Sequence, residues 1–146
     1  MKYIEKAKEV ISLEMAALKK VRDDLGKEFS RAVELILERL QQGGKVVGTG
    51  VGKNLPIGQK IASTLTSTGC PAIFMHPSDA MHGDLGILHN TDILLALSYS
   101  GESEELMNLI PLVRRYGDTI LSLCRQPDSA LPKNSSARRI RTAATL

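Results

Sequence analysis

Short apolar runs separated by helical patterns constrain the fold of this 146-residue chain more than any other feature. The apolar runs that indicate buried strands span residues 45–48, 71–75, 92–97 and 119–124. Between successive runs lie a loop and then apolar residues at helical spacing. Strands that alternate with helices in this way predict a parallel sheet with right-handed crossovers. The fold class is therefore predicted to be α/β, with the ligand outside the carboxyl ends of the strands.

A long helical lead-in precedes the first strand. Apolar residues recur at spacings of three and four from Ile4 to Leu18, and again from Leu25 to Leu40. This pattern predicts two helices, with Asp23 or Asp24 capping the second and Gly43-Gly44 ending it. Their apolar stripes need a cover, and the sequence alone leaves open whether a partner subunit or the chain's own sheet supplies it.

Charge and hydropathy exclude several classes of partner. The net charge is +3, but residues 1–132 hold 15 of the 19 Lys and Arg and all 16 acids, so the basicity belongs to residues 133–146. Because no basic patch is interleaved with aromatic residues, we expect no nucleic-acid partner. Apolar runs stop far short of the ~20 residues of a membrane span, and there is no signal peptide pattern, so we expect a cytoplasmic protein without a membrane partner.

A hydroxyl-rich turn follows the third predicted strand. It runs from Ser98 to Glu105 and leads into a helix. A phosphate there would meet backbone N–H groups, the positive end of a helix dipole and the hydroxyls of Ser98, Ser100 and Ser103. For the turn taken alone, an ordinary helix N-cap at Ser103 is the favoured interpretation, because such caps are common.

Two further loops follow strands and so share an edge of the sheet with this turn. The loop at 48–54 has three glycines in five residues, which let a ligand approach the backbone closely, but its spacing fits neither Walker A nor dinucleotide motifs. The loop at 76–86 holds two histidines and two aspartates, and histidine suits proton transfer near neutral pH. This convergence favours the phosphate-binding interpretation of the turn.

Three motifs together resemble the sugar isomerase (SIS) domain of the arabinose 5-phosphate isomerases. In chain order they are Gly-x-Gly-x-Gly-Lys, His-Pro-x-x-Ala-x-His-Gly-Asp-Leu-Gly and Ser-x-Ser-Gly-Glu-Ser-x-Glu, within a resemblance over residues 1–131. It implies a flavodoxin-like three-layer sandwich with a central parallel sheet, preceded by two N-terminal helices, and a homotetramer. It also implies interconversion of D-ribulose 5-phosphate and D-arabinose 5-phosphate without a cofactor, feeding 3-deoxy-D-manno-octulosonate biosynthesis for lipopolysaccharide or capsule.

The same resemblance implies roles for individual residues. Its catalytic positions fall on Lys53, His82 and Glu105. Glu105 suits the base that moves a proton between C1 and C2, Lys53 the stabilisation of the oxyanion, and His82 ring opening or proton exchange. The substrate contacts expected from the loops and the resemblance are Gly50, Gly52, Asn54, Gly69, Cys70, His76, Ser98, Ser100 and Ser103. His76 also matches a histidine that takes up inhibitory zinc, but a lone histidine is a poor zinc site unless other ligands converge.

The sequence also leaves an alternative function open and predicts that the domain is incomplete at its C-terminus. The alternative to an isomerase is a non-catalytic phosphosugar-binding SIS module, which needs only the hydroxyl turn. We expect a single SIS domain over residues 1–146 that is incomplete at its C-terminus, because the resemblance ends near residue 131. The fifth strand and a further helical half are expected to be replaced, CBS domains to be absent, and turnover of this chain to lie near background.

Overall fold

The computed structural model describes residues 2–117, 119–126, 128–134 and 140–141. The elements follow the chain as α1 (Lys2–Asp24), α2 (Lys27–Gln41), β1 (Val46–Gly50), α3 (Asn54–Ser67), β2 (Ala72–Phe74), α4 (Pro77–Met81), the 3₁₀ helix η1 (Asp84–Ile87), β3 (Ile93–Leu97), α5 (Glu104–Arg115), β4 (Thr119–Cys124), α6 (Ala130–Lys133) and β5 (Ile140–Arg141). Within these residues the strands form one parallel sheet in the order β2-β1-β3-β4-β5. This is the flavodoxin-like order, and the predicted fold class is confirmed.

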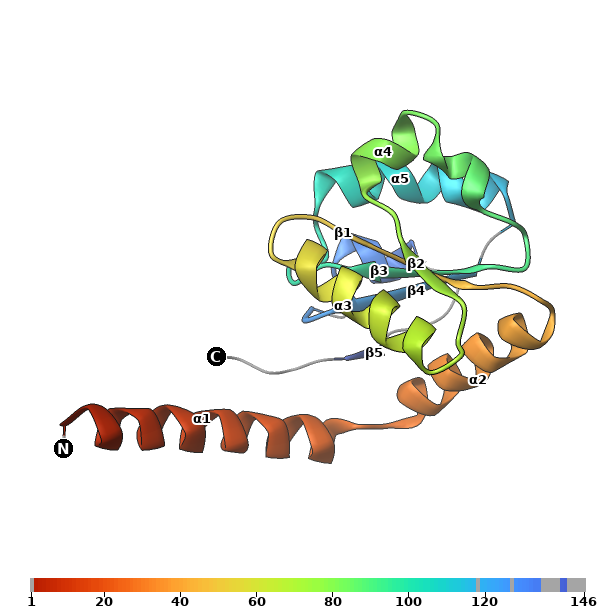
Figure 1. Cartoon of the computed structure of the whole chain (residues 1–146). Coiled ribbons are helices and arrows are strands. Elements are labelled where there is room, and N and C mark those ends of the chain that lie inside the picture. The colour runs from red at the N-terminus through yellow and green to blue at the C-terminus, as the bar shows by residue number, and fades with distance from the viewer. Residues whose placement is uncertain (1, 118, 127, 135–139, 142–146) are drawn as a thin grey trace.

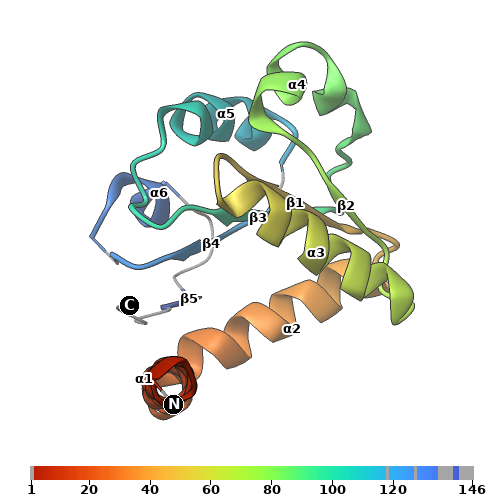
Figure 2. The same cartoon turned by 60° about the vertical axis from the view of Figure 1, so that its left-hand side comes forward.

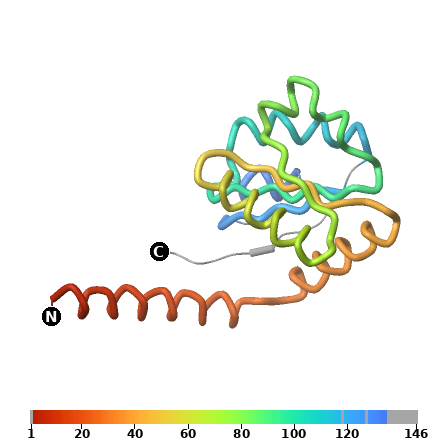
Figure 3. The backbone as a smooth tube through the Cα atoms, in the orientation of Figure 1, coloured from red at the N-terminus to blue at the C-terminus, as the bar shows by residue number. Residues whose placement is uncertain are grey.

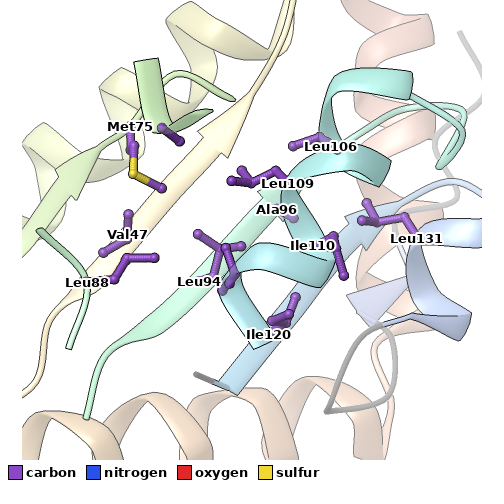
Figure 4. Packing of buried hydrophobic residues seen from close by; sticks show 12 residues of the cluster. Val47, Met75, Leu88, Leu94, Ala96, Leu106, Leu109, Ile110, Ile120 and Leu131 are labelled. Atoms are coloured by element: carbon purple, nitrogen blue, oxygen red, sulfur yellow. The ribbon is translucent and has the colours of Figure 1, made fainter. Parts of the chain in front are cut away.

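Helices cover both faces of the sheet, which makes three layers (Figures 1 and 2). One face packs against α2 and α3, and the other against α4, α5 and α6. Every residue of β1 and β3 is buried, as expected for central parallel strands that read as continuous apolar runs. Figure 4 shows the core under α5, which contains Val47, Met75, Leu88, Leu94, Ala96, Leu106, Leu109, Ile110, Ile120 and Leu131.

The chain leaves the two central strands, β1 and β3, on opposite faces of the sheet. Gly50 at the end of β1 is paired with Leu97 at the end of β3. From β1 the chain turns through α3 to β2 on one face, whereas from β3 it turns through α5 to β4 on the other face. Parallel sheets bind ligands in the crevice at such a switch point.

The amino edge of the sheet is closed by polar contacts. Asp92, which is 1% exposed, accepts hydrogen bonds from Lys45 N (2.9 Å), Lys45 Nζ (2.6 Å) and His89 N (2.9 Å). Burial by itself raises the pKa of Asp92, but the bonds from Lys45 and His89 and the charge of Lys45 outweigh it and hold the pKa below its ordinary value of 3.8. Arg39 of α2 donates a further bond to Thr119 Oγ1 at 2.6 Å, and this bond ties α2 to the same edge.

The N-terminal helices differ in what covers them. Helix α2 buries Ala32 against the sheet, whereas α1 buries no residue and extends away from the body (Figure 3). The predicted aspartate cap of α2 is wrong, because Gly26 is its N-cap and Asp23 lies inside α1, paired with Arg22 at 2.7 Å. The predicted end of α2 is confirmed, since Gly43 follows it with φ of 81°.

The end of the sheet departs from the sequence prediction. We expected the fifth strand to be missing, but β5 pairs in parallel with Leu123 and Cys124 of β4, so this part of the prediction is wrong. A two-residue strand is too short to give a recognisable apolar pattern. The rest of the predicted incomplete end, and most of the basic tail, concern residues outside those described. No helix in the described ranges combines the length and the apolar composition that a membrane span requires.

Candidate functional site

Two loops and two helix N-termini meet at the carboxyl edge. The loop after β1 and the turn after β3 are neighbours because their strands are paired up to Gly50 and Leu97. Helix α3 starts at Asn54 and α5 at Glu104, and they cover opposite faces of the sheet. The prediction that these loops share one edge is confirmed. Both helix dipoles direct their positive ends to this edge, where an anion is favoured.

The three hydroxyls of the turn are not equivalent. Ser98 is 1% exposed, and its Oγ accepts a hydrogen bond from Gly101 N at 3.0 Å and lies 2.8 Å from Ser103 Oγ. Ser100 is exposed, and its Oγ accepts a hydrogen bond from Glu102 N at 3.2 Å. Ser98 therefore builds the turn from the inside, while Ser100 and the half-buried Ser103 lie closer to solvent.

Ser103 occupies the N-cap position of α5 without performing the usual capping. Its side chain makes no cap hydrogen bond, because its Oγ is bonded to Ser98 instead. Within the described residues, the first N–H groups of α5 thus have no side-chain acceptor, whereas an ordinary cap would supply one. This arrangement suits a bound anion better than the plain N-cap interpretation does.

The far side of the turn is held by the segment that follows β4. Glu102 Oε1 accepts a hydrogen bond from Ala130 N at 2.7 Å, and Gly101 O accepts one from Leu131 N at 2.9 Å. Gly101 has φ of 72°, and a Cβ atom there would overlap Ser129 Oγ. Neither Glu102 nor Ser129 was predicted from the sequence to be a functional residue.

Tyr99 and Arg125 form the rim of the turn. Arg125 Nη1 donates to Tyr99 Oη at 2.8 Å, and the guanidinium carbon lies 5.5 Å from the centre of the ring. Arg125 N also donates to Tyr99 O at 3.2 Å. The rim thus places a guanidinium group against Tyr99 of the turn, a contact that was not predicted from the sequence.

The glycines in the loop at residues 48–54, after β1, have different structural roles. Gly52 has φ of 59°, in the left-handed region, and it precedes Lys53, the N-cap residue of α3. A Cβ atom on Gly50 would lie 3.0 Å from Asn54 Cβ and 3.1 Å from Leu97 O. Gly50 therefore lets β1, β3 and α3 approach closely, and its role here is packing.

The three predicted catalytic side chains are exposed and unengaged. Among the described residues, Lys53, His82 and Glu105 make no side-chain hydrogen bond or ion pair. Lys53 and Glu105 follow the paired strands β1 and β3, so the fold brings them to the same edge. His82 ends the short helix α4, which packs against α5 (Figure 2).

Of the other predicted contacts, Gly69 and Cys70 lie away from the hydroxyl turn, and His76 takes part in a helix cap. Gly69 and Cys70 lie between α3 and β2, at the amino edge, so the fold does not bring them to the carboxyl edge. His76 follows β2, but its Nδ1 accepts a hydrogen bond from Ser78 N at 3.2 Å and caps α4. The described residues contain no cluster of three His, Cys, Asp or Glu that could hold a metal, so nothing here supports the zinc prediction for His76.

Comparisons with known proteins agree with this geometry. The family described as "SIS domain" matches residues 39–144, which extends beyond residue 131. Arabinose 5-phosphate isomerase KdsD of Francisella tularensis is 40% identical over 134 residues, which are 92% of this chain but 41% of that protein. The chain thus spans less than half the length of this curated relative.

Solved structures give the same result. A Bacteroides fragilis protein assigned as a phosphosugar isomerase involved in capsule formation superposes with a TM-score of 0.88 at 38% identity, covering 96% of this chain and 73% of that one. An E. coli CFT073 protein in complex with arabinose 5-phosphate superposes with a TM-score of 0.85 at 30% identity, covering 97% and 76%.

Proposed function

The chain belongs to the SIS domain family, and from this membership we propose that it is an isomerase that interconverts D-ribulose 5-phosphate and D-arabinose 5-phosphate. The observation that carries the proposal is that Lys53, Glu105 and the hydroxyl turn all follow the carboxyl ends of the paired strands β1 and β3. The Francisella relative is named for this reaction, and the E. coli neighbour was solved with arabinose 5-phosphate bound.

The proposed mechanism begins with the phosphate at the N-terminus of α5. In the part of the chain that the structure describes, the N–H groups there have no side-chain acceptor, and Ser100 and Ser103 add hydroxyl donors. Glu105, in the first turn of α5, acts as the base that moves the proton between C1 and C2 along one face of the enediol. Lys53, at the N-cap of α3, stabilises the oxyanion that develops on the neighbouring oxygen.

The remaining parts of the proposal rest on the resemblance. His82 assists ring opening or proton exchange, and the reaction uses no cofactor. We propose that the enzyme works in the cytoplasm and that its product feeds 3-deoxy-D-manno-octulosonate biosynthesis for lipopolysaccharide or capsule.

We further propose that a second copy of the chain covers α1, within the homotetramer that the resemblance implies. Six large apolar side chains of α1 are more than half exposed: Tyr3, Ile4, Ile11, Leu13, Met15 and Leu18. On α2, Phe29, Val33 and Leu37 form an exposed stripe at spacings of four. With six basic and five acidic residues, α1 is nearly neutral, which favours a protein partner over an anionic membrane. Sedimentation should give an assembly larger than a monomer, and Leu18→Glu should dissociate it.

The decisive experiment separates an isomerase from a phosphosugar-binding module. The chain is mixed with D-arabinose 5-phosphate in D₂O, and NMR follows deuterium entry at C2 and formation of the ketose, with the full-length Francisella protein as positive control. We expect Glu105→Gln to bind the sugar but to abolish exchange, because the amide cannot accept the proton. Binding without exchange in the parent chain would favour the non-catalytic module, and exchange that persists in Glu105→Gln would leave His82 as the candidate base.

A further inference from the structure

Three acidic residues border the hydroxyl turn, but only one is engaged. Within the described residues, the carboxylates of Glu104 and Glu105 have no hydrogen-bond partner, whereas Glu102 Oε1 accepts from Ala130 N at 2.7 Å. Such charge-assisted bonds are the stronger kind. Glu102 therefore differs from Glu104 and Glu105 in its contacts.

The contact replaces a missing cap of α6. Ser129 is the N-cap residue of α6, but its Oγ donates to Gln126 O at 2.6 Å and makes no cap bond. The first two N–H groups of α6 are satisfied instead by Glu102 Oε1 and by Gly101 O. The turn after β3 thus supplies the acceptors that the N-terminus of α6 lacks.

Helix α6 is a firm anchor for this bond. Leu131 is 1% exposed and belongs to the core under α5 (Figure 4). Pro132, the next residue, is also buried. Gly101 lies directly against Ser129, where no side chain would fit. The backbone from Ser100 to Glu102 is therefore clamped between its own strand and α6.

We propose that Glu102 is a positioning residue for the phosphosugar, acting through α6 on the hydroxyl turn; this rests on the proposed function of the turn. By binding Ala130 N, it fixes the backbone whose N–H bonds to Ser100 Oγ, at 3.2 Å, and so orients that hydroxyl. The same bond directs the Glu102 carboxylate to α6, so the negative charge does not approach the bound phosphate.

The direction of the change in phosphosugar affinity distinguishes a positioning role of Glu102 from a purely electrostatic one. Removing a negative charge near an anion site should by itself leave phosphate affinity unchanged or tighten it. Glu104→Ala, the matched control one helix position into α5, should behave in this way. Glu102→Ala should instead weaken binding of D-arabinose 5-phosphate about tenfold, because a charge-assisted bond that orders the turn is lost. Glu102→Gln keeps an acceptor oxygen and should stay within about threefold of the parent.

Calorimetry on the full chain measures these affinities, and circular dichroism checks that each variant is folded. In an active preparation, Glu102→Ala should raise KM about tenfold and change kcat less than about twofold. Equal affinities for Glu102→Ala and Glu104→Ala, or a fall in kcat without a change in KM, would overturn the positioning role.

If Glu102→Ala fails to fold, the affinities of Glu102→Gln and Glu102→Asp are compared instead. The shorter aspartate cannot keep the reach of Glu102, so equal affinities would again reject the role.

The two proposals fail differently. If the parent chain binds the sugar without turnover, the isomerase proposal fails, while the affinity series still tests Glu102. If the parent chain binds neither the sugar nor inorganic phosphate, the anion-binding turn itself is rejected, and the role of Glu102 with it.

Discussion

The charged side chains at the two edges of the sheet differ in whether they are bonded to other groups of the protein. At the amino edge, Asp92 is buried and accepts three hydrogen bonds, and Lys45 and Arg39 are bonded to it or beside it. At the carboxyl edge, the charged side chains of Lys53 and Glu105 are exposed and make no bonds within the described residues.

This contrast separates stability from function along the same strands. Charged groups that bind each other stabilise the fold but have no capacity left for a ligand, whereas unengaged donors and acceptors can meet a substrate. We therefore expect substitutions at the amino edge to change the free energy of unfolding, and those at the carboxyl edge to change binding and turnover. The hydroxyl turn is a mixed case, because Ser98 and Glu102 are bonded while the side chain of Ser103 does not cap the N–H groups of α5.

The largest expected effect is at the amino edge. Asp92→Ala should lower the free energy of unfolding by about 3 to 5 kcal/mol, because it leaves the half-buried Lys45 ammonium and two backbone N–H groups without their acceptor. Urea unfolding followed by circular dichroism measures this loss. Glu34→Ala on the exposed side of α2 is the control, with a change within about 0.5 kcal/mol. Equal losses in the two variants would contradict the amino-edge argument.

A glycine pair tests how tightly the carboxyl edge is built. Gly101 and Gly43 have φ of 72° and 81°, but a Cβ atom overlaps Ser129 at Gly101 and meets nothing within 4 Å at Gly43. Gly43→Ala should cost about 1 to 2 kcal/mol of stability through strain alone. Gly101→Ala should cost about 3 kcal/mol and also weaken phosphosugar binding, because the turn must move. Similar costs for the two variants in urea unfolding would mean that the contact with Ser129 yields easily.

Two serines of the turn should separate its scaffold from its ligand contacts. Ser98→Ala should lower the free energy of unfolding by about 1 to 3 kcal/mol, because the buried Gly101 N–H loses its acceptor. Ser100→Ala should leave stability nearly unchanged and weaken phosphosugar binding by about 1 to 3 kcal/mol. Unfolding and calorimetry on both variants give the four values. Unchanged sugar affinity in Ser100→Ala would count against the anion-binding turn.

The sequence predicted the parts of the molecule that depend on local pattern. Buried parallel strands read as apolar runs, as in Ile93–Leu97, and Gly43 with its positive φ follows the end of α2 as expected. The shared edge of the loops followed from the parallel topology alone. These features need no knowledge of which distant residues meet.

Contacts between residues that are far apart in the sequence could not be predicted from local patterns. Lys45 and Asp92 are 47 positions apart, and Glu102 and Ala130 are 28 apart, so no sequence spacing relates them. Ser103 looks like a helix cap in sequence, and only the position of Ser98 in the fold shows which oxygen its hydroxyl meets.

The smallest expected effect is the pH dependence of the amino edge. The pKa of Asp92 in the folded chain is held below its ordinary value of 3.8, so folding favours the ionised carboxylate. The stabilisation is therefore complete above pH 3.8 and is lost as the pH falls through the lower pKa of the folded state. Urea midpoints measured from pH 6 down to pH 2 should fall more steeply in the parent chain than in Asp92→Asn, which starts less stable but cannot titrate at this position. Parallel curves for the two proteins would mean that other carboxylates, and not the Lys45–Asp92 pair, govern acid unfolding.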